Sequence, residues 1–114
     1  MKIRLATVAE YDDLGRLMFE AVHVEPSPYT EAQRRAWAPA PRQGVDWAKR
    51  LAAQTIFVGE CDGAVLGFMS LAPKGYVDFA YILAQARGSG LFSQLLDEIE
   101  RTARERGEAR LWVH

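Results

Sequence analysis

The chain has a single cysteine, Cys61, among its 114 residues. One cysteine excludes an internal disulfide bond and a zinc site built on cysteines. The formal net charge is −1, which gives no general electrostatic attraction to nucleic acid or to an anionic membrane. No apolar run approaches the roughly 20 residues that cross a bilayer, and the N-terminal sequence lacks a signal-peptide core. We therefore expect a cytoplasmic protein with no metal site and with neither nucleic acid nor membrane as a partner.

The apolar content that is present suffices for one folded domain. Hydrophobic residues make up 49% of the chain and charged residues 25%. A chain of this length buries roughly two-thirds of the surface that it exposes when unfolded. The sequence has no internal repeat, low-complexity tract or linker, so we predict a single domain over residues 1–114.

The first residues predict a strand followed by a helix. Ile3 and Leu5 alternate with basic residues, which is typical of a half-buried strand. Thr7 and Glu10 have the spacing of a capping box, and apolar residues at helical spacing follow them. The predicted helix therefore begins at Thr7.

Two shorter helices are expected next. Thr30 and Gln33 repeat the capping-box spacing and open a short helix that carries Trp37 and stops before Pro39. After a loop that contains proline and glycine, residues 45–53 are expected to form a further short helix.

The second half of the chain predicts a meander of strands. Residues 55–60 and 65–71 are rich in residues that favour strands, and the Asp62-Gly63 pair between them is typical of a hairpin turn. Residues 76–83 are expected to form the next strand, and residues 109–113 a fifth strand.

A short loop, Arg87 to Gly90, joins the strand that ends at residue 83 to an amphipathic helix that opens at Leu91; we call it the Gly loop. Glycine-rich backbone at a helix N-terminus directs several N–H groups to one point, where the helix dipole favours negative charge. The loop is neither a P-loop, since no lysine follows Gly90, nor a dinucleotide fingerprint, since Ser93 stands where a third glycine is required. These residues fit a phosphate-binding loop and a simple strand-to-helix turn about equally well.

Arg87, Gly90 and Phe92 occupy the marked positions of Q/R-x-x-G-x-G/A, the cofactor motif of the GCN5-related N-acetyltransferase family, which this segment resembles. Two positions match, and Phe92 replaces the small residue. Either the last turn of the loop opens differently, or the ring points away from the pyrophosphate. The run YVDFAYIL is similar to the family's fourth strand, and LFSQLLDEIE to its third helix.

A second run, YTEAQRRAWAP at residues 29–39, resembles the YafP-like branch of the same family together with the later GYVDFAYI. The resemblance implies an α/β (α+β) fold with a mostly antiparallel mixed sheet flanked by helices. Family members continue through a further helix and two strands, so we expect this chain to be C-terminally truncated. An unpaired strand edge invites pairing with another molecule, and we therefore expect a homodimer.

The resemblance implies an acetyl-CoA-dependent N-acetyltransferase that acts on a small amine by direct attack of the amine on the thioester. The alternative is a non-catalytic CoA-binding or self-assembling fragment, which Phe92 and the absence of the family's usual proton-donating tyrosine favour. By carry-over, the thioester carbonyl lies near the N–H groups around Tyr81 to Leu83, and the pyrophosphate lies on those from Gly88 to Phe92. The implied cofactor residues are Ile82, Leu83, Arg87, Gly88, Ser89, Gly90, Leu91 and Phe92.

Asp78 is the candidate base. Family members often carry a glutamate where this chain has Tyr76, and period-two alternation places Asp78 on the same strand face. The alternative is an aspartate that binds backbone or an arginine at the strand edge. Tyr81, which adjoins the Gly loop, is the second catalytic candidate, although the pattern favours a half-buried packing role with a hydrogen-bonded hydroxyl.

The acceptor is expected to contact aromatic side chains and one amide, which suit a small, partly apolar molecule. The candidates for this substrate pocket are Tyr29, Gln33, Trp37 and Tyr76. A hydrophobic staple between the two short helices explains the first three as well. His23, at a helix end, and Cys61 are weaker candidates for any site role.

Overall fold

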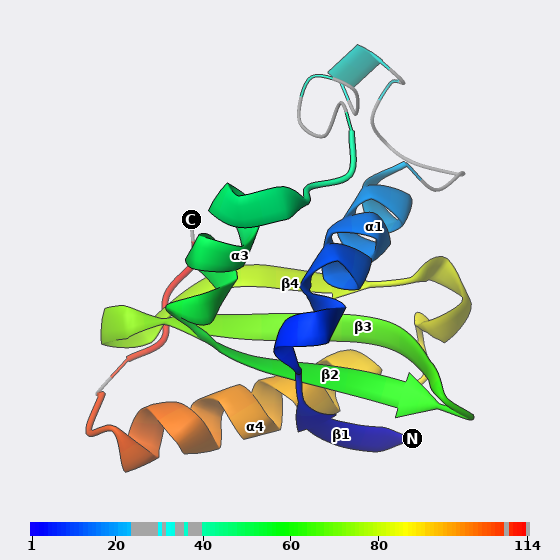
Figure 1. Ribbon diagram of the computed structural model, residues 1–114. Coiled ribbons are helices and arrows are strands. Elements are labelled where there is room, and N and C mark those ends of the chain that lie inside the picture. Colours follow the sequence, from blue (N-terminus) through cyan, green and yellow to red (C-terminus); the bar gives the residue numbers. More distant parts are fainter. Residues whose placement is uncertain (24–29, 31, 34–35, 37–39, 109, 114) are drawn as a thin grey trace.

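The computed structural model describes residues 1–23, 30, 32–33, 36, 40–108 and 110–113. Four antiparallel strands form one sheet in the order β1-β2-β3-β4, with α1 and α3 over one face and α4 over the other (Figure 1). The strands are β1 Lys2–Leu5, β2 Thr55–Cys61, β3 Ala64–Ala72 and β4 Tyr76–Ile82. The helices are α1 Tyr11–Val22, α3 Gly44–Ala52 and α4 Leu91–Glu105. The α+β fold predicted from the sequence is confirmed.

The capping box at Thr7 is present, but a single 3₁₀ turn, Val8–Glu10, comes before α1. The Glu10 carboxylate accepts a hydrogen bond of 2.9 Å from the Thr7 backbone N–H. Arg4 on β1 binds the same carboxylate through two nitrogens, at 2.9 and 2.8 Å, and also binds Glu60 on β2 at 3.1 Å. These contacts attach the start of α1 to the edge of the sheet.

The second capping box also forms. The Thr30 N–H donates to Gln33 Oε1 at 2.8 Å, and the Gln33 N–H donates to Thr30 Oγ1 at 3.1 Å. Trp37, which the predicted helix carries, lies outside the described residues. The helix predicted over residues 45–53 is confirmed as α3, and it begins one residue earlier.

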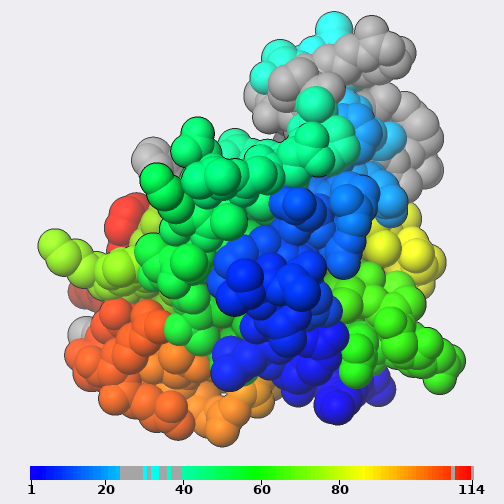
Figure 2. Space-filling view, in the orientation of Figure 1, coloured from blue at the N-terminus to red at the C-terminus, as the bar shows by residue number. Residues whose placement is uncertain are grey.

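Two helices pack over the sheet on the face that Figure 2 shows in blue and green. Their contact depends on Gly15 in α1, because a Cβ atom there would lie 1.9 Å from the backbone oxygen of Arg42. Trp47 of α3 is buried between them, and its indole N–H donates to the Tyr11 carbonyl at 2.6 Å. The segment that leads into α3 is therefore pressed directly against α1.

On the other face, the N-terminus of α4 packs closely on the sheet. Gly59 on β2 pairs with Gly67 on β3, and both lie beneath Leu91, the first residue of α4. A Cβ at Gly59 would lie 2.2 Å from Leu91 Cδ1, and one at Gly67 would lie 3.0 Å from Leu91 Cδ2. These two strand glycines leave the space that lets Leu91 bury all but 1% of its surface.

A β-bulge interrupts β4 at Asp78. Ser70 on β3 pairs with Phe79, whereas Leu71 pairs with Val77, so Asp78 is an extra residue. Val77 therefore packs with the α4 side, while Phe79 packs with the α1 and α3 side. The bulge also brings Asp78 and Tyr81 to the same face, which strict alternation would have separated.

The fifth strand was predicted over residues 109–113, and the described part of that range, residues 110–113, forms a single bridge instead of a strand. Trp112 pairs with Tyr76 in parallel orientation, with the Val77 N–H donating to the Trp112 carbonyl at 2.8 Å. The Trp112 ring stacks on Tyr76 at 4.4 Å, and its indole N–H donates to the Lys74 carbonyl at 3.1 Å. These contacts fix the segment beside the start of β4.

Candidate functional site

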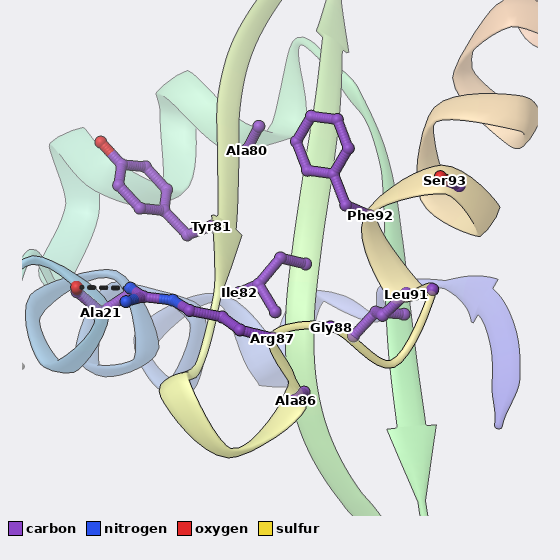
Figure 3. A pocket seen from close by; sticks show the side chains of 11 residues that line it. Ala21, Ala80, Tyr81, Ile82, Ala86, Arg87, Gly88, Leu91, Phe92 and Ser93 are labelled. Carbon is purple, nitrogen blue, oxygen red and sulfur yellow. Dashed lines mark hydrogen bonds between the residues drawn. The ribbon is translucent and has the colours of Figure 1, made fainter.

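A groove of about 580 Å³ follows the outer edge of β4 and reaches the start of α4 (Figure 3). Its lining contains most of the predicted cofactor residues, together with Tyr81. The lining residues are Ala21, Ala80, Tyr81, Ile82, Ala86, Arg87, Gly88, Gly90, Leu91, Phe92 and Ser93. Leu83 and Ser89, also predicted to bind cofactor, lie outside this lining.

The Gly loop has the backbone conformation of an anion site. Gly88 and Gly90 have φ values of 81° and 89°, which favour glycine, and a Cβ at either position would meet nothing within 4 Å. The backbone ladder of α4 begins where the Gln94 N–H donates to the Gly90 carbonyl at 3.1 Å. The N–H groups of Phe92 and Ser93 are thus left without a partner among the described residues, at the positive end of the helix dipole. Open space lies above these donors.

Arg87 does not direct its side chain into the Gly loop. Its guanidinium donates a hydrogen bond of 3.2 Å to the carbonyl of Ala21, near the C-terminus of α1 (Figure 3). Cations are favourable at helix C-termini. The arginine of the motif therefore ties the loop to α1 here, and binding of cofactor by its side chain stays a prediction.

Phe92, the departure from the family motif, does not cover the Gly loop. Figure 3 shows its ring beside Ala80 and directed away from Gly88. The side chain is half exposed, at 50%. The second of the two expected arrangements, with the ring turned away from the loop, is the one that the structure contains.

Beyond the Trp112 bridge, the outer edge of β4 has no strand partner among the described residues. The N–H of Leu83 donates to the Leu66 carbonyl at 2.9 Å, so it is used inside the sheet. Alternation gives Tyr81 the same direction and turns the N–H of Ile82 to the open edge. Of the three N–H groups expected to serve the thioester carbonyl, that of Ile82 has the suitable direction.

Asp78 is held by two side chains from the α3 side of the sheet. Arg50 binds it through both carboxylate oxygens, at 3.0 and 2.8 Å, and Gln54 donates to it at 2.7 Å. Burial tends to raise the pKa of this carboxyl, but the hydrogen bonds from Arg50 and Gln54 outweigh that effect and leave the pKa below its usual value. Such a carboxylate is a weak base. This geometry favours the alternative of an arginine partner, and the role of Asp78 as base stays a prediction.

Tyr81 is half-buried in an aromatic cluster with Phe68 and Phe79, at ring distances of 6.0 and 6.4 Å. Burial raises the pKa of its hydroxyl, an effect that the nearby charge of Arg42 partly opposes. The phenol is therefore protonated at neutral pH and can donate a hydrogen bond into the groove.

The predicted substrate pocket is not assembled by the described residues. Tyr76 stacks on Trp112 and is absent from the groove lining. Gln33 uses its amide oxygen in the capping box, and Tyr29 and Trp37 lie outside the described residues. The pocket stays a prediction.

His23 and Cys61 gain no site role from the structure. His23 lies against the Phe19 ring at 4.2 Å, and the Cys61 thiol is exposed. Within the described ranges, no three histidine, cysteine or carboxylate side chains cluster to hold a metal. The same residues include no helix long and apolar enough to span a bilayer.

Sequence reasoning missed the ion-pair partners of Asp78 and the glycines beneath Leu91. Arg50 and Gln54 lie one helical turn apart near the end of α3, and this i, i+4 spacing was the available signal. Gly59 and Gly67 stand inside strand patterns, where glycine often marks a close approach of another segment.

The model of the acetyltransferase (GNAT) family matches residues 16–114. The chain belongs to this family. A GCN5-related N-acetyltransferase from Rhodopseudomonas palustris is similar in structure, with a TM-score of 0.88 and 25% identity over 98% of this chain and 71% of that one. An N-acetyltransferase from Staphylococcus aureus Mu50 is 27% identical, with a TM-score of 0.61, over 94% of this chain and 68% of that one.

A third structure, yncA from Salmonella typhimurium, holds its cofactor acetyl-CoA. It shares the fold at a TM-score of 0.63 and is 24% identical over 95% of this chain and 65% of that one. Among curated proteins, none matches this sequence significantly. The fold and the GNAT family are thus shown.

Proposed function

We propose that this GNAT protein is an acetyl-CoA-dependent N-acetyltransferase that transfers the acetyl group to a small amine by direct attack of the amine on the thioester. The observation that carries the proposal is the groove, in which the Gly loop and the start of α4 present unpartnered N–H groups beside the open edge of β4. Membership of the family supports the same reaction class.

Acetyl-CoA is a substrate here, and the groove provides donors suited to its two polar parts. The N–H groups of Phe92 and Ser93 suit the pyrophosphate, since a helix N-terminus favours negative charge. The outward N–H of Ile82 suits the thioester oxygen, which gains negative charge as the tetrahedral intermediate forms. Because Gly88 and Gly90 have no Cβ atom, the space beside the loop stays open for the pyrophosphate.

In the reaction, the neutral amine nitrogen forms a bond to the acetyl carbon, the bond from that carbon to sulfur breaks, and a proton from the nitrogen passes to the departing thiolate. The amine must be neutral to attack, but with a pKa of about 10 it is mostly protonated at neutral pH. Because the pKa of Asp78 is lowered by Arg50 and Gln54, we assign removal of the ammonium proton to water. The Tyr81 hydroxyl, which stays protonated, is the proposed hydrogen-bond donor to the departing thiolate.

A non-catalytic CoA-binding or self-assembling module is the second candidate, and the ion pair that occupies Asp78 favours it. We further propose that the protein belongs to the YafP-like branch, is cytoplasmic and forms a homodimer. Mass measured in solution tests the last of these.

The test is calorimetric titration of the 114-residue protein with acetyl-CoA, beside the variants Gly90→Val and Gly63→Val. Both glycines have positive φ values, 89° and 82°, and a Cβ at either meets nothing within 4 Å. The substitutions therefore impose similar backbone strain, but only Gly90 lies in the groove. We expect Gly90→Val to lower the affinity about 100-fold and Gly63→Val to leave it within about threefold.

Equal affinities of the two variants for acetyl-CoA would show that the Gly loop does not bind the cofactor. Absence of acetyl-CoA binding by folded parent protein would overturn the proposed function. Binding without thiol release from acetyl-CoA, across a broad panel of amines, would favour the non-catalytic module.

A further inference from the structure

The side of β4 that faces α3 carries more positive than negative charge. Asp78 forms an ion pair with Arg50 at 2.8 Å, so these two charges cancel. Arg42 adds a second guanidinium to the same region. In the part of the chain that the structure describes, no carboxylate lies within ion-pair distance of Arg42.

Arg42 is held in place by its backbone and by an aromatic ring. Its carbonyl packs on Gly15, where a Cβ would approach to 1.9 Å, so the backbone position is fixed against α1. Its guanidinium lies over the ring of Trp47, 5.6 Å from the centroid. Trp47 is 4% exposed and is anchored to Tyr11 by its indole N–H. An exposed arginine with such support is less free than an ordinary surface side chain.

The charge of Arg42 acts on residues of the groove. Trp47 packs edge-on against Phe79 at 5.2 Å, and Phe79 lies 6.4 Å from Tyr81, which lines the groove. Arg42 also lowers the pKa of Tyr81 against the larger, raising effect of burial, and contributes to the lowered pKa of Asp78. The positive charge of Arg42 therefore acts on Tyr81, a residue that lines the groove.

We infer that the acceptor carries a carboxylate beside its amine, and that this carboxylate binds the guanidinium of Arg42, which has no ion-pair partner in the described part of the chain. The inference rests on the proposed function and narrows the acceptor to amines of the amino-acid class. A planar guanidinium matches a carboxylate with two parallel hydrogen bonds. A purely cationic amine would instead meet a net positive region.

The same charge assists the chemistry. A nearby positive charge disfavours the ammonium form of the acceptor and so lowers the pKa of its amine. A larger fraction of the bound acceptor is then neutral and able to attack. Arg42 thereby compensates in part for a carboxylate, Asp78, that is already held by Arg50.

The test compares matched acceptors that differ in the carboxylate. The pairs are glycine with glycinamide, L-alanine with L-alaninamide and L-phenylalanine with L-phenylalaninamide, and thiol release from acetyl-CoA gives kcat and KM. The amide has the lower amine pKa because it lacks the negative charge of the carboxylate. A larger fraction of the amide is therefore neutral and reactive, and a preference for the carboxylate cannot come from its amine pKa. We expect at least one carboxylate to exceed its amide about tenfold in kcat/KM.

Arg42→Gln should abolish this preference by lowering kcat/KM for the carboxylate about tenfold, mainly through a higher KM, with a smaller fall in kcat because less of the bound amine is neutral. Arg42→Lys should restore part of it, since a point charge attracts the carboxylate without the bidentate geometry. Arg104→Gln, on the exposed surface of α4, is the matched control and should behave as the parent. Equal loss in Arg42→Gln and Arg104→Gln would overturn the inference.

A second readout does not need turnover. In ¹⁵N-labelled protein saturated with CoA, the Arg42 Nε–H resonance should shift and saturate with the carboxylates, and much less with the amides. If acetyl-CoA binds but no carboxylate of the panel either shifts this resonance or reacts in preference to its amide, the inference fails while the cofactor part of the proposed function stands. Loss of acetyl-CoA binding itself would count against the proposed function.

Discussion

The two sides of β4 differ in the chemical groups that they present, which are backbone N–H groups on one side and side chains on the other. On the α4 side, the groove offers backbone N–H groups from the Gly loop and the helix start, positioned by Leu91 packing over two glycines. On the α3 side, the sheet carries charged and aromatic side chains, positioned by ion pairs and ring contacts, and of these Tyr81 lines the groove. A site made of backbone is sensitive to any added atom, whereas a site made of side chains is sensitive to changes in charge.

The largest effect on this comparison is expected from a change in the packing of Leu91. Leu91→Ala should lower the free energy of unfolding by about 3 kcal/mol and weaken acetyl-CoA binding, because a side chain that is 1% exposed leaves a cavity beneath the helix start. Gly59→Ala alone should cost about 1–3 kcal/mol, because its Cβ would overlap Leu91.

In the Leu91→Ala background, Gly59→Ala should instead be neutral or stabilising, since the added methyl fills part of the cavity. Urea denaturation of the four proteins measures this coupling. Additive effects of the two substitutions would show that the strand glycine does not make room for Leu91.

The α3 side is probed by Asp78→Asn, which removes charge and keeps shape. We expect the free energy of unfolding at pH 7 to fall by about 1–2 kcal/mol, because Arg50 loses an ionised partner. The folded pKa of Asp78 is lowered, so its contribution is present above the unfolded value of 3.8 and is lost as the pH falls through the folded value.

Activity gives the second reading of the same variant. With a panel amine that is turned over, kcat/KM should keep its pH profile, because a carboxylate held by arginine does not act as base. Asp97→Asn, on the exposed side of α4, serves as the control. If the pH dependence of kcat/KM shifts in Asp78→Asn and not in Asp97→Asn, Asp78 acts as the base.

The smallest effect is expected away from β4, where Arg4 binds Glu10 and Glu60. The hydrogen bonds from Arg4 lower the pKa of Glu10 from 4.5 to about 2. The resulting stability is present above pH 4.5 and disappears as the pH falls toward 2. Because solvent screens this pair, Glu10→Gln should cost about 1 kcal/mol at pH 7 and almost nothing near pH 2.

Urea denaturation at both pH values measures this difference. Glu100→Gln, which removes an exposed carboxylate 4.0 Å from Arg104, should show a smaller difference between them. A cost for Glu10→Gln that does not change with pH would mean that packing, not charge, makes its contribution.

The backbone half of the site was predictable because its signals are local. Gly88 and Gly90 mark positive φ values directly, and the helix that follows is visible in its apolar spacing. The same holds for the hairpin at Asp62-Gly63, whose two positive φ values match the predicted turn. Each of these features depends on residues that are neighbours in the sequence.

The side-chain half depends on contacts between distant segments. Arg50 and Asp78 are 28 residues apart in the sequence and meet because α3 packs on the sheet. The bulge at Asp78 has no glycine or proline to mark it, and it alone brings Asp78 to the face of Tyr81. The predicted fifth strand likewise depends on a distant segment, because its one bridge joins Trp112 to Tyr76.

The bulge also divides β4 into two stretches with different freedom to vary. Up to Val77, the strand is bonded on both edges, by β3 and by Trp112, and substitutions there disturb the sheet. From Asp78 onward, the outer edge is open among the described residues, and side chains can change with little effect on backbone pairing. For protein engineering, the exposed Ala80 and the half-buried Ile82 are therefore the positions at which acceptor preference can be redesigned while the scaffold is kept, because Asp78 is held by Arg50 and Phe79 is buried.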